Sequence, residues 1–170
     1  LWIPATNGGI NDFEGFTVAG NTCGYYSFSL SLNCDTLFEM QLVDTDMRIA
    51  DNRPAGTDFW NNGAVPTFFK VSAPANGKVA VTGLNGVALG EVAIGADGFS
   101  EWFDVTVGIE FNETTKFITL HYYINGEYVN SASTDVSTRL VLGKIDGVYF
   151  QIKSHAEGTG VKFDNVVFGY

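Results

Sequence analysis

Two acidic residues near opposite ends of the chain are the first candidates for chemistry. Asp164 lies within the apolar segment 160–170, and Glu14 lies in the first expected strand. A carboxylate among apolar neighbours is unfavourable unless it is paired or bound to a cation. We therefore expect the first and last strands to pair and to share a structural calcium ion, with Asp12 available as a third carboxylate ligand. The alternatives are solvated carboxylates at strand ends, or an ion pair between Asp164 and Lys162.

The segment that carries Asp164 is expected to be a strand because β-branched and aromatic residues dominate it. Phe163 lies on one side of the alternation, and Val166 and Phe168 lie on the other. Apolar residues on both sides predict a strand that is covered on both faces. Asp164 is in step with Val166, so its charge is expected to be set among buried residues.

Cys23 and Cys34 are the only two cysteines, and they flank the alternating segment 25–32. Hairpin-like strands between them would bring the two thiols together. So low a count fits one disulfide in an exported protein. Two free thiols in a reduced core are the alternative.

The length and charge of the chain limit its domain organisation and its binding partners. The 170 residues suffice for one core, so we expect a single domain over 1–170, monomeric, and a module of a larger secreted or cell-surface protein. Nine basic residues against 19 acidic ones give a net charge of −10, which argues against nucleic acid and anionic membranes as partners. No apolar run approaches the roughly 20 residues of a membrane span, so membrane insertion is not expected.

The pattern along the chain is that of strands separated by turns. Asn76-Gly77, Asn85-Gly86 and Asn125-Gly126 predict tight turns between short apolar alternations. No segment has a convincing helical period. The expected strands cover 12–18, 25–32, 37–49, 67–72, 78–83, 87–94, 102–111, 117–124, 127–131, 148–152 and 160–170. These features predict an all-β fold of two packed antiparallel sheets.

Three short motifs resemble a known family. The hairpin from Trp102 to Gly126, followed by Phe163-Asp164-Asn165-Val166, resembles the later strands of concanavalin-A-like (laminin-G-like) jelly-roll domains. Phe13-Glu14-Gly15 near the start, with that same end, resembles calcium-holding jelly-roll carbohydrate-binding modules. In those modules a Glu near the first strand and an Asp in the last strand are metal ligands. The resemblance implies a jelly-roll β-sandwich, a carbohydrate ligand, and calcium at Glu14 and Asp164.

A polar sheet face that mixes aromatic and hydrogen-bonding side chains is the expected ligand site. Aromatic rings stack on the C–H face of a sugar, and polar groups bind its hydroxyls. An ordinary solvent-facing sheet is the alternative, and Trp60 in the long loop 51–63 is a rival platform. The residues expected on this face, together with Glu39 and Gln41, are Trp102, His121, Tyr123, Tyr149 and Gln151.

Catalysis is not expected. The Glu-x-Asp-x-x-Glu pattern of jelly-roll glucanases is absent, as are the full strand motifs of jelly-roll lyases. A carboxylate pair could still form across strands, for example Glu39 with Asp104 or Glu110. The sequence therefore predicts a non-catalytic, lectin-like carbohydrate-binding module. A polysaccharide lyase or glycoside hydrolase, and an adhesion domain with a protein ligand, are the alternatives. The sequon at Asn112 does not discriminate among them.

Overall fold

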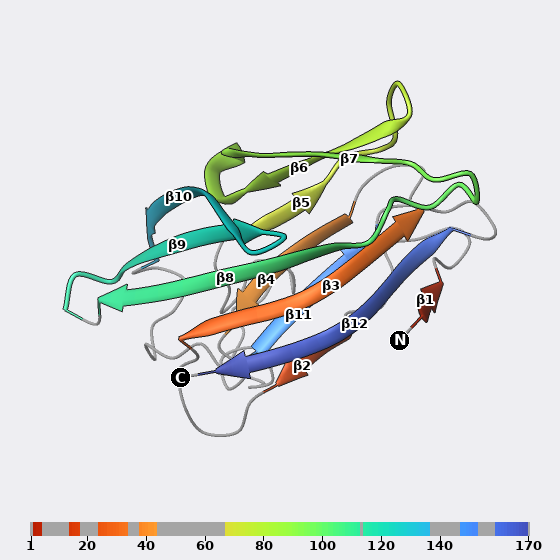
Figure 1. The fold of residues 1–170 in the computed structure, drawn as a ribbon. Helices are drawn as coiled ribbons and strands as arrows, with labels where there is room; N and C mark the ends of the chain where they lie inside the picture. Colours follow the sequence, from red (N-terminus) through yellow and green to blue (C-terminus); the bar gives the residue numbers. More distant parts are fainter. Residues whose placement is uncertain are drawn as a thin grey trace, which may run out of the picture.

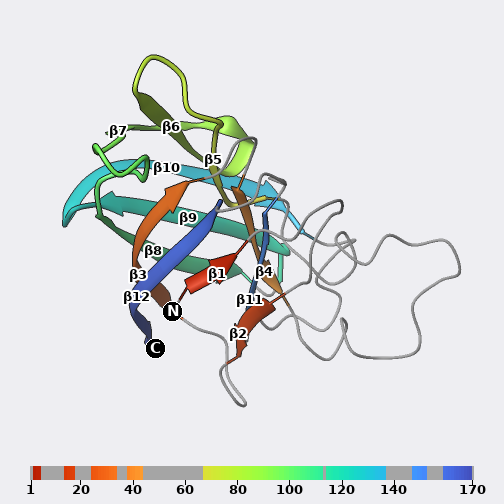
Figure 2. The same cartoon turned by 90° about the vertical axis from the view of Figure 1, so that its right-hand side faces the viewer.

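Two antiparallel sheets pack face to face in the computed structural model, which describes residues 2–4, 14–17, 24–33, 38–43, 67–112, 114–136, 147–152 and 159–169. Sheet A contains, in spatial order, β1 (Trp2–Pro4), β12 (Gly160–Gly169), β3 (Tyr25–Asn33), β8 (Phe103–Asn112), β9 (Phe117–Ile124) and β10 (Glu127–Asp135). Sheet B contains β2 (Glu14–Thr17), β11 (Gly147–Ile152), β4 (Phe38–Val43), β5 (Phe69–Val71), β6 (Lys78–Gly83) and β7 (Ala88–Ala93). Sheet A lies in front in Figure 1, and Figure 2 shows the two layers from the side. The predicted all-β sandwich is confirmed.

The β8–β9 hairpin shows why the alternating sequence forms strands. Val105 pairs with Ile124 and Asn112 pairs with Phe117, so the apolar residues of both strands project from the same side of sheet A. That side is the interior, and the alternate positions face solvent. Buried residues of the two strands are Phe103, Val105, Val107, Ile109, Ile118, Leu120 and Tyr122.

Aromatic rings join the two sheets in the core. Phe28 of sheet A meets Phe69 of sheet B edge-to-face at 5.7 Å, and Phe163 of sheet A lies 5.9 Å from Phe38 of sheet B. An edge-to-face pair such as Phe28–Phe69 is favourable beyond the area that it buries. The sheets therefore pack through large side chains contributed by both layers.

Tyr122 also joins the sheets by hydrogen bonds. Its buried hydroxyl donates to the carbonyl of Phe68 at 2.6 Å and accepts the backbone N–H of Leu84 at 2.8 Å. Leu84 begins η2 (Leu84–Gly86), the turn after β6. A Cβ placed on Gly83 would come within 2.7 Å of the Tyr122 ring, so glycine is needed for this close approach. Burial raises the pKa of the Tyr122 hydroxyl.

The predicted asparagine–glycine turns are confirmed. Asn125 and Gly126 have φ values of 51° and 81° between β9 and β10, a left-handed pair that matches the twist of a hairpin. Asn76 and Gly77 likewise have positive φ before β6. The turn at Asn125 brings its side chain beside β8, where it becomes part of the site described below.

The predicted pairing of the first and last strands is wrong. β12 lies between β1 and β3, whereas β2, which contains Glu14, is an edge strand of sheet B and pairs with β11. A three-residue strand that the sequence pattern did not reveal, β1, takes the predicted position beside β12. None of the described elements is a helix long and apolar enough to cross a bilayer.

Candidate functional site

The residues predicted to share one polar face belong to two different sheets. Trp102, His121 and Tyr123 belong to the outer side of sheet A, whereas Tyr149 and Gln151 lie in β11 of sheet B. Alternation predicts which residues of a strand share a side, but it does not say which sheet contains the strand. The single predicted face is therefore wrong.

A polar row crosses the outer side of sheet A. Asp164 of β12 pairs with Ser29 of β3, which pairs with Asp104 of β8. The Ser29 hydroxyl donates to Asp104 Oδ1 at 2.5 Å and accepts the Asn165 side-chain amide at 3.0 Å. Asn125 Oδ1 accepts the backbone N–H of Asp104 at 2.9 Å. Buried Ser29 thus fixes the positions of the more exposed residues around it.

A bulge in β12 explains why Asp164 lies on this outer side. The register shifts by one residue between Asp164 and Val167, and Asn165 takes φ = 50°. Such a bulge inserts one extra residue and changes the phase of the strand. Val166 consequently packs on the core, while Asp164 and Val167 are exposed. The expectation of a charge set among buried residues, in a strand covered on both faces, is therefore wrong.

The row borders a hollow of about 370 Å³ on the surface. Trp102 lies beside it with 52% of its surface exposed. Among the described residues, each of the two carboxylates has a single side-chain hydrogen bond: Asp104 Oδ1 accepts from Ser29, and Asp164 Oδ1 accepts the Asn165 N–H at 2.8 Å. The second oxygen of each remains able to accept from a ligand. The lining residues are Ser29, Trp102, Asp104, Asp164 and Asn165.

A second aromatic group stands on the same outer side. Tyr123 of β9 pairs with Tyr128 of β10, and their rings meet edge-to-face at 5.5 Å. Exposed fractions are 36% for Tyr123 and 57% for Tyr128. Tyr123 was predicted as a site residue, whereas Tyr128 was not. The pairing register of β10 with β9 places Tyr128 beside Tyr123, and this register cannot be predicted from the sequence of either strand alone.

His121 lies away from the hollow. It pairs with Gly108 on β8, four positions along the strand from Asp104. Its Nε2 is 3.4 Å from Glu110 Oε1. The structure therefore groups His121 with Glu110, and separates it from the Trp102 hollow with which it was predicted to act.

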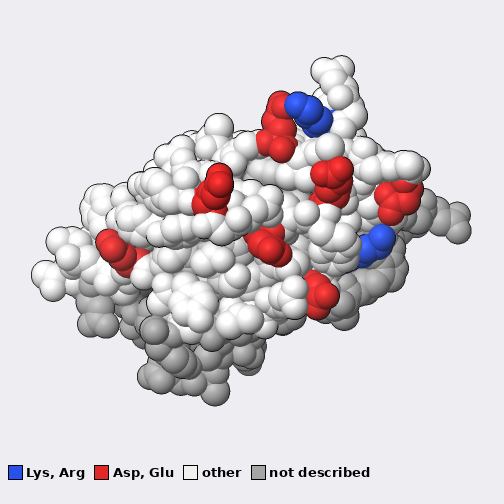
Figure 3. Space-filling model, viewed as in Figure 1, with Lys and Arg blue, Asp and Glu red and all other residues white. Residues whose placement is uncertain are grey.

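Acidic side chains predominate on the outer side of sheet A. Figure 3 shows them spread over this face, with basic side chains near its top and right margins among the coloured residues. Lys162 is the basic residue nearest along the strand to Asp164, and its ammonium lies 3.6 Å over the Phe99 ring. The predicted alternative of an ion pair between Lys162 and Asp164 is not the interaction that the structure shows.

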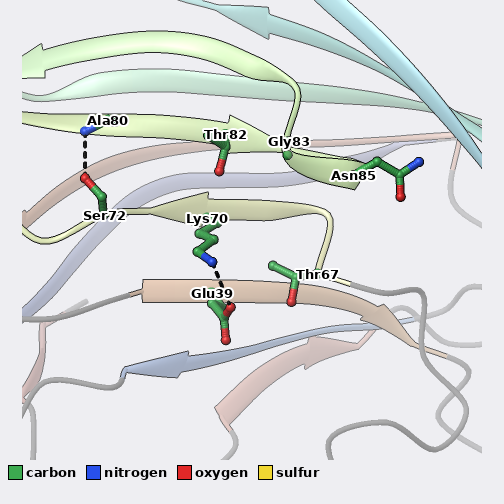
Figure 4. A pocket seen from close by; sticks show the side chains of 9 residues that line it. Glu39, Thr67, Lys70, Ser72, Ala80, Thr82, Gly83 and Asn85 are labelled. Atoms are coloured by element: carbon green, nitrogen blue, oxygen red, sulfur yellow. Dashed lines mark hydrogen bonds and ion pairs between the residues drawn. The ribbon is translucent and has the colours of Figure 1, made fainter.

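The outer side of sheet B carries a larger groove of about 530 Å³ (Figure 4). Lys70 Nζ is 3.7 Å from Glu39 Oε1, and this pair lies among hydroxyl groups. No aromatic side chain is among the described residues that line it. Because Glu39 faces this groove, it is separated from Asp104 and Glu110 by the whole sandwich, so these cannot form the carboxylate pairs considered from the sequence. The lining residues are Glu39, Thr67, Lys70, Ser72, Ala80, Thr82, Gly83, Asn85 and Gly86.

The predicted metal ligands are distributed over both sheets. Glu14 lies in β2 of sheet B and Asp164 in β12 of sheet A, while Asp12 lies outside the described residues. Within the described part of the chain, no group of three or more His, Cys, Asp or Glu side chains could hold a metal ion. The shared calcium ion stays a prediction, without the strand pairing on which it rested.

Three further predicted residues lie outside the described segments. These are Trp60 in the long loop and the two cysteines, Cys23 and Cys34. The loop platform and the disulfide therefore stay predictions.

Solved structures of other proteins resemble this chain in fold. No protein-family model and no curated protein sequence matches the chain. A tetrameric galectin from the ball sponge Cinachyrella sp. aligns over 94% of this chain and 100% of its own, with a TM-score of 0.50 and 11% identity. A laminarinase from Flavobacterium sp. covers 92% of this chain and 69% of its own, with a TM-score of 0.48 and 6% identity. Lectin II from Ulex europaeus aligns over 99% of this chain and 86% of its own, with a TM-score of 0.36 and 13% identity. The galectin likeness, which concerns the fold alone, confirms the predicted concanavalin-A-like jelly roll.

Proposed function

We propose that this chain is a non-catalytic, lectin-like carbohydrate-binding domain that acts outside the cell, with its site on the outer side of sheet A. One observation carries the proposal: the exposed Trp102 ring borders a hollow whose polar groups are fixed by buried Ser29. A pyranose presents an apolar C–H face and a rim of hydroxyls. It therefore needs one ring to stack on and several hydrogen-bonding atoms nearby.

The hydrogen-bonding groups of the hollow favour a ligand that brings donors. Ser29 already donates to Asp104, and Asn165 already donates to Ser29. The free oxygens of Asp104 and Asp164 are acceptors. Hydroxyl or ammonium groups match them, whereas a uronate or sulfate group would meet like charge. The ligand class is thus a neutral or amine-bearing sugar.

A binding role is preferred to a catalytic one because of where the carboxylates lie. Glycoside hydrolysis by two carboxyl groups requires both to flank one bond. The carboxylate pairs considered from the sequence lie on opposite outer faces of the sandwich. Asp104 and Asp164 share a hollow, so product analysis must accompany the binding test.

The test is binding to a panel of polysaccharides by affinity electrophoresis. Trp102→Ala should weaken binding about tenfold, because loss of a stacked ring removes roughly 1–2 kcal/mol. Phe117→Ala is the matched control, since Phe117 is a similarly exposed ring at the far end of the same sheet, at 47%. Its binding should equal that of the parent chain.

Other outcomes would replace the proposal. Loss of binding in Lys70→Ala but not in Trp102→Ala would place the site in the groove of sheet B. New reducing ends or unsaturated products, abolished by Asp104→Asn, would show an enzyme. Failure to bind any polysaccharide, together with capture of a defined protein at the Trp102 face, would show an adhesion domain.

A further inference from the structure

Aromatic rings stand on both sides of the polar row of sheet A. Trp102 immediately precedes β8, and Asp104 and Thr106 are the next outward positions, on β8 itself. Thr106 pairs with Tyr123 of β9. Asp104 is therefore flanked by Trp102 in one direction and by the position of Tyr123 in the other. From Trp102 to Thr106 is four residues, which is about 14 Å along an antiparallel strand.

The second aromatic group is a pair of rings rather than a single one. Tyr128 pairs with Tyr123 across β9 and β10, and the edge-to-face contact at 5.5 Å holds the two rings against each other. Both remain exposed, Tyr128 more than any other large hydrophobic residue described. Exposed rings fixed by a mutual contact lose little conformational freedom when a ligand stacks on them.

Between the two aromatic groups lie hydrogen-bonding side chains and no described bulky one. Ser27 and Thr106 join their hydroxyls at 2.9 Å, and Asn125 holds the backbone of Asp104. A ligand that stacks on Trp102 and on the tyrosine pair would pass over this polar stretch. A single sugar ring is too short to touch both aromatic groups.

Resting on the proposed function, we propose that the ligand is an internal stretch of a linear, neutral or amine-bearing polysaccharide. The chain lies along β8 from Trp102, over Asp104, to Tyr123 and Tyr128. Trp102 with Asp104 holds one sugar, and Tyr128 is a specificity-determining residue that holds a sugar further along the chain. The site then distinguishes long chains from short ones.

The experiment measures affinity against chain length by isothermal titration calorimetry. The probes are cello-, laminari-, N-acetylchito- and chitosan oligosaccharides, from monosaccharide to hexasaccharide. For the series that binds, affinity should rise about tenfold from disaccharide to hexasaccharide as the second platform becomes occupied. Tyr128→Ala should abolish this gain, while Tyr128→Phe, which keeps the ring, should retain it.

The results separate this inference from the proposed function. Trp102→Ala should weaken binding at every length, and Phe117→Ala at none. Equal affinity at all lengths overturns the inference and leaves carbohydrate binding intact. So does a hexasaccharide affinity that Tyr128→Ala does not change. Failure of every saccharide, with the parent chain folded, overturns the proposed function itself.

Discussion

The outer faces of the two sheets use polar residues in different ways. On sheet A, the Ser29 hydroxyl donates to Asp104 and accepts from Asn165 beside an exposed tryptophan, which leaves carboxylate oxygens for a ligand. On sheet B, Lys70 and Glu39 lie close enough to neutralise each other in a larger groove. No ring is among the described residues that line that groove. The smaller hollow is the better candidate, because a sugar site is recognised by its chemistry more than by its volume.

Both outer faces depend on one shared core, and Tyr122 is the core residue whose loss should destabilise it most. Tyr122→Phe would leave the Phe68 carbonyl and the Leu84 N–H buried without their partner. We expect the free energy of unfolding to fall by about 3 kcal/mol, because each orphaned buried group costs about 1–3 kcal/mol. Urea unfolding measures this. Tyr123→Phe, next in sequence but exposed, should change it by less than about 0.5 kcal/mol; equal losses would show that the link between the sheets contributes nothing.

The buried Tyr122 hydroxyl should also make the free energy of unfolding depend on pH. Burial raises the pKa of its hydroxyl in the folded state above the ordinary value, so folding favours the neutral form. Its contribution is fully present below about pH 10 and is lost as pH rises from there towards the folded-state pKa. Unfolding free energies measured from about pH 8 to about pH 11 should fall more steeply in the parent chain than in Tyr122→Phe. Parallel curves would contradict this.

The predicted calcium ion would link the two sheets, because its predicted ligands Glu14 and Asp164 belong to different sheets. If the ion binds the folded state only, it stabilises by roughly 2.7 kcal/mol at a hundredfold excess over its dissociation constant. Chelator should lower the melting temperature and calcium should restore it, with magnesium a poor substitute. Asp164→Asn and Glu14→Gln should each abolish the response. A response lost in only one of them would rule out a shared site.

Two serines of β3 distinguish recognition from stability. Ser29→Ala removes the hydroxyl that holds Asp104 and Asn165, so affinity should fall about fivefold, equivalent to about 1 kcal/mol. Ser31→Ala loses only the buried bond to the Ser100 carbonyl, at 2.8 Å. It should lower unfolding free energy by about 1 kcal/mol with sugar affinity unchanged. The reverse pattern, measured by calorimetry and urea unfolding, would remove Ser29 from the site.

The smallest effect is expected on sheet B. Lys70 is 45% exposed, so its pair with Glu39 is partly screened by water. Lys70→Met should therefore lower unfolding free energy by less than about 1 kcal/mol and leave sugar affinity unchanged. A larger change in affinity than Trp102→Ala produces would reverse the ranking of the two faces.

Local patterns predicted the hairpins, and long-range register did not follow from them. The β8–β9 hairpin and the turn at Asn125 could be predicted because alternation and turn chemistry are properties of neighbouring residues. The alternation of the sequence puts Trp102 and Tyr149 in phase with polar residues and so predicts one shared face, although β8 and β11 belong to different sheets. Tyr128 was missed because its partner is set by the β9–β10 register.

The prediction of which β12 residues face the core is wrong for a different reason. Strict alternation places Asp164 with Val166, and one extra residue, Asn165, moves them to opposite sides. Nothing in the spacing of the apolar residues reveals such a bulge. In the structure the bulge is marked by the positive φ of Asn165, a backbone conformation that asparagine adopts more often than most other non-glycine residues.

Because the bulge adds a single residue, deleting Asn165 would restore an uninterrupted ladder between β12 and β3. Val166 would then stand opposite Phe28, still on the core side, and Asp164 would stay opposite Ser29. The deletion would remove the Asn165 amide, which donates to the Ser29 hydroxyl, and would leave Val166 on the core side. Residue 165 is therefore a position at which ligand recognition can be altered by mutation without redesigning the core.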